Sequence, residues 1–130
     1  MNNHSSTAQQ EQAWVQALAN EARRDLVFLW HITEGRFGRP SYESSELHKL
    51  VERVASALVD YGCMVGFGDP DSVNWRVPSE LAIASAEKGK CIAHLWQSEP
   101  DAYRFLVFAL RQPEPTVAKN RPQQSNQNDA

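Results

Sequence analysis

The feature that most constrains the fold is an apolar run at positions 105–110, FLVFAL, near the end of the 130-residue chain. In a strand, alternate side chains point to opposite faces, and here both faces are apolar. One face can pack on helices. The other needs cover from a further element, a partner or a second copy of the chain, because small proteins seldom leave such a patch exposed. A homodimer through this second apolar face is therefore one expectation.

The strand partners of this run are expected nearby in the sequence. Residues 90–96 and 102–111 have the pattern of two strands joined across 97–101, which predicts a C-terminal hairpin. Residues 63–67 form a short apolar run bounded by glycine, which predicts a buried strand. Trp75 and Val77 alternate with polar residues and indicate a further short strand. The sheet is expected to be small and mainly antiparallel.

Three helices are expected to pack on this sheet. Apolar residues spaced by three and four predict one long helix over 12–34, ending before Gly35. A second begins at an N-cap, Ser44 or Ser45, and stops at Gly62, and a third spans 79–89. The predicted fold class is α+β, with three helices and a C-terminal hairpin. Its expected core includes Leu26, Leu29, Leu50, Val54, Leu58, Phe105 and Val107.

Length and composition indicate one domain, expected over 9–111. Residues 1–8 are small and polar, and 112–130 contain prolines but no aromatic residue, so both ends are expected to be disordered tails. The formal charge of −3 argues against a nucleic-acid-binding role. No apolar run approaches the roughly 20 residues of a membrane-spanning helix, and the first ten residues lack a secretion signal. A cytoplasmic protein without membrane contact is expected.

Calcium binding is not expected. Asp69, Asp71 and Glu80 occupy the first, third and twelfth places of a calcium-loop template. Val73 and Asn74, however, stand where that loop needs a ligand and a glycine. The segment is therefore interpreted as an acidic surface loop.

The cysteines and histidines do not predict a zinc site or a catalytic site. Cys63, Cys91, His31 and His94 include the donor atoms that zinc prefers. Cys91 and His94 are three residues apart, and in the expected strand they would point to opposite faces. No nucleophile elbow of glycine, serine and glycine occurs either, although a cysteine could still meet His94 in three dimensions. The chain is expected to be no enzyme, with no catalytic residue, metal or cofactor.

Two acidic loops form the candidate partner-binding site. Asp69 and Asp71 lie in one and Glu99 and Asp101 in the other, and both adjoin aromatic residues. Trp75 follows the first loop, where it either anchors the loop or contacts a partner. Aromatic anchors with an acidic rim would attract a basic protein and repel nucleic acid. We therefore expect these five residues to bind a protein partner.

Three segments resemble small bacterial immunity proteins, which neutralise toxins of contact-dependent or other interbacterial competition systems. They are FLWHITEGRFG at 28–38, VERVASALVDYGCMVGFG at 51–68 and IAHLWQSEPDAYRFLVF at 92–108. The resemblance also rests on the order long helix, helix, short strand, helix, hairpin. It implies a cytosolic α+β protein that binds and blocks one toxin domain, often a basic nuclease, and it carries over no catalytic residue.

A winged-helix DNA-binding regulator is the alternative. Helices at 13–34, 45–61 and 79–88 followed by a hairpin wing would match that class equally well. The segment in the place of a recognition helix, PSELAIASAEKGK, offers only Lys88 and Lys90. DNA-binding proteins concentrate basic charge, so the sequence favours protein binding over this alternative.

Overall fold

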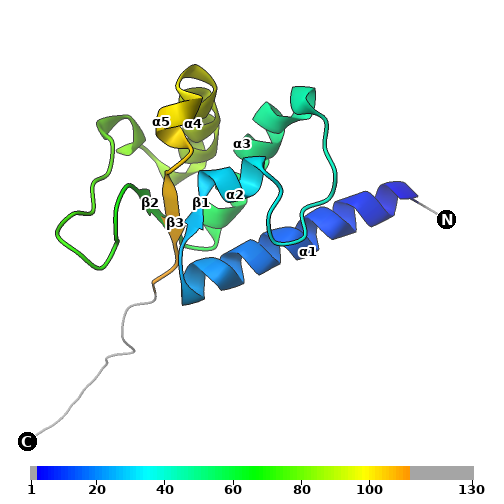
Figure 1. Cartoon of the computed structure of the whole chain (residues 1–130), viewed down its shortest axis with the longest axis horizontal. Helices are drawn as coiled ribbons and strands as arrows, with labels where there is room; N and C mark the ends of the chain where they lie inside the picture. The colour runs from blue at the N-terminus through cyan, green and yellow to red at the C-terminus, as the bar shows by residue number, and fades with distance from the viewer. Residues whose placement is uncertain (1–2, 112–130) are drawn as a thin grey trace, which may run out of the picture.

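The fold is a three-stranded antiparallel sheet with helices packed around it (Figure 1). The computed structural model describes residues 3–111, so the expected tail at 112–130 lies outside the described residues. Strands β1 (Val27–Phe28), β2 (Met64–Gly66) and β3 (Val107–Ala109) are arranged in the order β1-β3-β2. Val27 is opposite Phe108 in the register, and so is Val65. The predicted α+β class and the antiparallel sheet are confirmed.

Within residues 3–111, five α-helices surround the sheet, where three were predicted. They are α1 (Asn3–Arg24), α2 (Leu29–Thr33), α3 (Leu47–Asp60), α4 (Ser85–Ser98) and α5 (Pro100–Tyr103), with 3-10 turns η1 (Ser44–Glu46) and η2 (Ser79–Leu81). Figure 1 shows α1 on one side of the sheet and α4 and α5 on the opposite side. Among the described residues, no helix is both long and apolar enough to span a membrane.

The predicted helix over 12–34 is wrong in its middle, because the chain leaves the helix after Arg24 and forms β1 before it enters α2. The cause is tertiary: the Leu29 amide donates to the Leu106 carbonyl and the Trp30 amide to the Arg104 carbonyl. Leu26, expected in the core, is only half-buried at the break. Helix α1 begins at Asn3, inside the segment that was expected to be a tail.

The predicted C-terminal hairpin is also wrong. Residues 90–96 belong to α4, and β3 pairs with β1 and β2 instead. Ile92 and Ala93 are buried and Leu95 and Trp96 half-buried, so the apolar residues follow helical spacing as well as strand alternation. The predicted helix over 79–89 is interrupted: Ser79–Leu81 form η2, and α4 begins at Ser85 and continues through Gly89, where the helix was expected to end.

The chain itself covers both faces of the run that β3 belongs to. Residues 106–110 are all buried, so no apolar face of a hairpin is left for a second copy, and that route to a homodimer is wrong. Phe105 was expected in the core, but 52% of its surface is exposed. The other expected core residues are buried: Leu29, Leu50, Val54, Leu58 and Val107.

Gly89 allows α4 to pack closely against α3. A Cβ atom at this position would lie 1.9 Å from the Ser56 Oγ and 2.8 Å from the Glu52 carbonyl oxygen. The hydroxyl can rotate away, but the carbonyl belongs to the backbone of α3. The separation of these two helices is therefore set by the absence of a side chain at Gly89.

Gly89→Ala should destabilise the protein, although alanine is the better helix former by about 1 kcal/mol. We expect overpacking to reverse that gain and to leave a net loss of about 1–2 kcal/mol in the free energy of unfolding. Urea unfolding measures it, and Lys90→Ala, at an exposed position of the same helix, is the control. Greater stability of Gly89→Ala than of the wild type would contradict the close contact.

Candidate functional site

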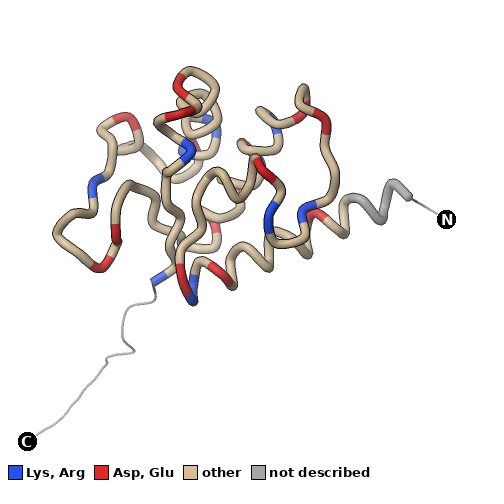
Figure 2. The backbone as a smooth tube through the Cα atoms, in the orientation of Figure 1, with Lys and Arg blue, Asp and Glu red and all other residues tan. Residues whose placement is uncertain are grey.

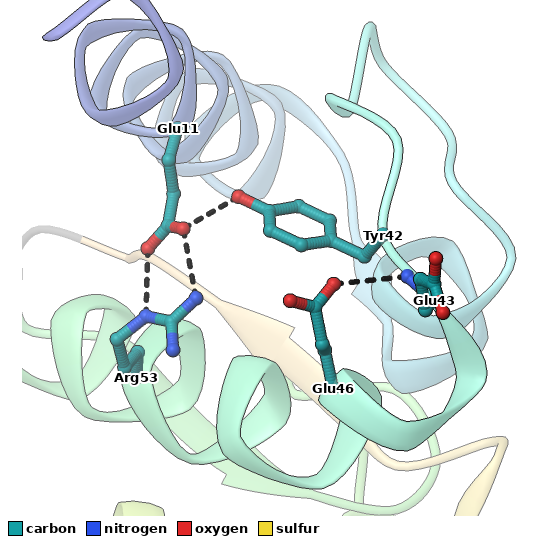
Figure 3. Close-up of polar contacts among 5 residues, drawn as sticks. All are labelled: Glu11, Tyr42, Glu43, Glu46 and Arg53. Atoms are coloured by element: carbon teal, nitrogen blue, oxygen red, sulfur yellow. Dashed lines mark hydrogen bonds and ion pairs between the residues drawn. The ribbon is translucent and has the colours of Figure 1, made fainter. Parts of the chain in front are cut away.

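A polar cluster around Glu11 joins three segments of the chain (Figure 3). The Tyr42 hydroxyl donates to Glu11 Oε1 at 2.5 Å, and Arg53 donates to both carboxylate oxygens, at 2.9 and 3.0 Å. Next to the cluster, the Glu43 amide donates to Glu46 Oε1 at 3.0 Å and closes the first turn of η1. The cluster thereby fixes α1 to α3 and to the segment that precedes η1.

The hollow beside this cluster is a weak candidate for catalysis. It has a volume of about 430 Å³ and lies between α1 and α3. The hydrogen bond from Arg53 lowers the pKa of Glu11, while burial and the hydrogen bond to Glu11 raise the pKa of Tyr42 to about 12. A carboxylate stabilised in its ionised form is a poor base, and a tyrosine with a raised pKa holds its proton. The cluster is therefore interpreted as a set of stabilising contacts between α1, α3 and the segment that precedes η1.

Of the two cysteines, Cys91 and not Cys63 lines a hollow together with His94. Cys91 and His94 line one hollow of about 370 Å³ beside α4, so the expectation that they point to opposite faces is wrong. The Cys91 thiol donates to the Glu80 carbonyl at 3.4 Å, and burial raises its pKa. Burial also raises the pKa of Cys63, to about 11. Among the described residues, no three His, Cys, Asp or Glu side chains lie close enough together to hold a metal ion.

A third hollow, which we call the aromatic hollow, lies between the segment 67–78 and the corner of α4 and α5. Its volume is about 470 Å³. Phe67 and Tyr103 are in contact in its wall, with ring centroids 5.6 Å apart, and the Arg76 guanidinium lies 5.2 Å from the Phe67 ring centre. It is lined by Phe67, Arg76, Pro78, Glu99, Ala102, Tyr103 and Phe105.

One acidic side chain, that of Glu99, lines the aromatic hollow. Burial raises the pKa of the Tyr103 hydroxyl, and the negative charges of Glu80 and Glu99 raise it further. Figure 2 shows acidic positions at the turn from α4 into α5.

The structure separates the residues of the expected acidic site. Glu99 lines the aromatic hollow, and Asp101 is exposed in the first turn of α5. The carboxylate of Asp69 accepts from the Asp71 amide at 2.9 Å within its own loop. Asp71 in turn accepts a bond from Arg111 at 3.4 Å. Only Glu99 of these four is therefore a lining residue of the hollow.

Trp75 anchors the loop, one of the two roles expected for it. It is half-buried, and a Cβ atom at Gly66 would lie only 2.6 Å from Cζ2 of the Trp75 indole. Phe67 and Arg76 exchange backbone hydrogen bonds of 2.8 and 2.9 Å at the base of the same loop. Partner contact by Asp69, Asp71 and Trp75 stays a prediction.

A tight turn at 35–38, which is not among the expected site residues, presents an aromatic side chain to solvent. Gly35, Phe37 and Gly38 have φ angles of 78°, 65° and 82°, and 41% of the Phe37 surface is exposed. A left-handed conformation is unfavourable for phenylalanine and persists only where the surroundings enforce it. The glycines on both sides of Arg36 and Phe37 are the sequence signal for this turn. We call residues 35–38 the Phe37 turn.

The Phe37 turn is held by hydrogen bonds from both sides. The buried Trp14 indole donates to the Arg36 carbonyl at 2.8 Å. Arg39 donates to the carbonyls of Ile32 and Thr33, at 2.9 and 3.2 Å, at the end of α2. These contacts fix the direction in which the exposed ring points.

A row of contacts runs from the Phe37 turn to the edge of the aromatic hollow. The ring centroids of Phe37 and His31 are 5.0 Å apart, and those of His31 and Trp30 are 4.1 Å apart. The Arg104 guanidinium lies 5.9 Å from the Trp30 ring centre and 5.1 Å from that of Phe105. Phe105 in turn lines the hollow. Side-chain contacts therefore connect the Phe37 turn to Phe105 at the edge of the aromatic hollow.

Comparisons of the chain with protein-family models, with curated proteins and with solved structures find no match. We therefore infer a function from the aromatic hollow and the Phe37 turn.

Glu11→Gln should weaken the protein at neutral pH and have little effect in acid. The pKa of Glu11 is lower in the folded state than the ordinary value of 4.5, so its stabilisation is present above that value and is lost as the pH falls through the lowered pKa. With Arg53 half-exposed, we expect a loss of about 1 kcal/mol at pH 7.

Urea unfolding of both proteins at pH 7 and pH 3 measures this difference, with Glu43→Gln as the control at a nearby exposed carboxylate. A deficit of Glu11→Gln that is as large at pH 3 as at pH 7 would show that the ionised carboxylate is not the stabilising species.

Proposed function

We propose that the chain is a non-enzymatic protein-binding module that binds and neutralises a toxin domain, as the resemblance to immunity proteins implies. The observation that supports this most is the aromatic hollow, where aromatic rings and the Glu99 carboxylate are combined in one concave surface.

The aromatic residues of the hollow suit a protein partner. The rings of Phe67 and Tyr103 are in contact in its wall, and Phe105 is half-exposed at its edge. Aromatic side chains near the centre of an interface contribute much of the binding energy, because they lose most contact with water there. A side chain of the partner entering this hollow would cover Phe105 and the exposed edges of the other two rings.

The charges around the hollow suit a basic partner. Glu99 lines the hollow and is exposed, and Asp101, in the first turn of α5, is exposed too. Such carboxylates accelerate association with a positively charged protein, and they disfavour the phosphates of nucleic acid. Arg76, on the opposite wall, lies against the Phe67 ring. We therefore propose a basic, nuclease-like toxin domain as the partner.

The winged-helix alternative has less support from the fold. Its wing required a hairpin at 90–111, and residues 85–98 form α4 instead. Basic and acidic residues also alternate along the described chain (Figure 2), and no long basic stretch marks a nucleic-acid surface there.

The proposal is tested with a toxin domain encoded beside this chain, by measuring growth rescue on co-expression and binding kinetics with the purified proteins. Glu99→Lys should slow association and reduce its salt dependence, while Phe105→Ala should accelerate dissociation by about tenfold or more. Asp60→Lys, the same charge change at the end of α3, should leave both rates unchanged.

Three outcomes would contradict the proposal. They are no growth rescue and no binding, unchanged kinetics for both hollow variants, or binding to mixed-sequence DNA at moderate salt in place of the toxin domain.

A further inference from the structure

The chain carries both a projecting apolar side chain and a cavity of matching chemistry. Phe37 projects from a turn that Trp14 and Arg39 hold in place, so little conformational freedom would be lost when it inserts into a partner. The aromatic hollow, at about 470 Å³, offers the rings of Phe67 and Tyr103 as contact surfaces. Edge or offset contacts between aromatic rings are favourable.

The charges next to these two features are opposite. Arg36 is exposed beside Phe37, and its guanidinium lies 5.4 Å from the Trp30 ring centre. Glu99 is exposed and lines the hollow. When the Phe37 ring of one copy enters the hollow of another, Arg36 therefore approaches a carboxylate.

A row of side-chain contacts through His31, Trp30, Arg104 and Phe105 joins the two features. A two-fold axis near the middle of this row would bring each Phe37 turn to the hollow of the other copy. Both sets of contacts would then form at once, and the assembly would close at two copies.

We propose that the chain forms a symmetric homodimer in which the Phe37 turn of each copy occupies the aromatic hollow of the other. This route is distinct from the expected one through a hairpin face, since it uses residues that are exposed in the single chain. Taken together with the proposed function, the dimer would close the hollow until a toxin domain displaces the second copy.

Sedimentation of the purified chain over the micromolar concentration range is the first test, and a monomer–dimer equilibrium is expected. Phe37→Gly should weaken the dimer by about tenfold or more. Glycine accepts the left-handed conformation, and this gain offsets the lost contact with His31, so the variant should melt close to the wild-type temperature. Loss of the dimer is then assigned to the missing ring and not to a damaged fold.

A charge exchange identifies the contact between copies. Arg36→Glu alone and Glu99→Arg alone should each be monomeric, because like charges would face each other twice in either homodimer. An equimolar mixture should form a heterodimer, in which both pairs are again opposite. Lys49→Glu, at an exposed site on α3, is the control and should dimerise like the wild type.

A chain that is monomeric throughout, a Phe37→Gly dimer as tight as the wild type, or a mixture that fails to recover the dimer would each overturn the proposal. Growth of species larger than a dimer would overturn its two-fold symmetry. These results are independent of the toxin assay, since they use the chain alone. Monomeric Phe37→Gly should still bind a toxin domain if the proposed function is correct.

Discussion

The hydrogen bonds of residues 104–111 hold the rest of the fold together. The carbonyls of Arg104 and Leu106 accept the first amides of α2, and β3 pairs on its two sides with β1 and β2. At its other end, the Leu110 amide donates to the Ala22 carbonyl, and Arg111 donates to the carbonyls of Ala22 and Asp25. One short segment therefore completes the end of α1, the start of α2 and both outer strands.

The elements that the sequence predicted well have local signals. The second predicted helix is present as η1 and α3, with a regular apolar stripe that ends before Gly62. The expected N-cap is wrong, because Ser44 and Ser45 lie inside η1, and Glu43 and Glu46 occupy the N-cap positions of η1 and α3. Strand β2 is confirmed inside the predicted range of 63–67. In both cases the spacing of apolar residues and the flanking glycine agree on one structure.

The elements that the sequence predicted wrongly depend on distant contacts. Nothing local ends α1 at Arg24, because the residues on both sides of the break face the same core. The bonds on both sides of the break involve Arg104, Leu106, Leu110 and Arg111, some 80 positions later in the chain. Residues 90–96 satisfy strand alternation and helical spacing alike, and the contact of Gly89 with α3 favours the helix in the folded protein. The spacing of apolar residues in the sequence does not tell a helix from a strand at these positions.

The candidate surface could be predicted in part. Carboxylates beside aromatic residues at 99–103 were visible in the sequence, and Glu99 does line the hollow. The hollow itself was not visible, because it needs α5 to turn the chain and the loop at 67–78 to lie beside it. Arg36 and Phe37 between two glycines were equally visible, but their direction depends on Trp14, which is 22 positions earlier.

The strand order β1-β3-β2 has a consequence for how the protein is made. Both outer strands leave the ribosome before the central strand that pairs with them. Until β3 has been synthesised, the nascent chain contains no complete sheet, and the apolar faces of α1 and α3 can only contact each other or a chaperone. Sheet formation is therefore one of the last events in folding, and it brings Phe67, which follows β2, beside Tyr103, which precedes β3, in the aromatic hollow.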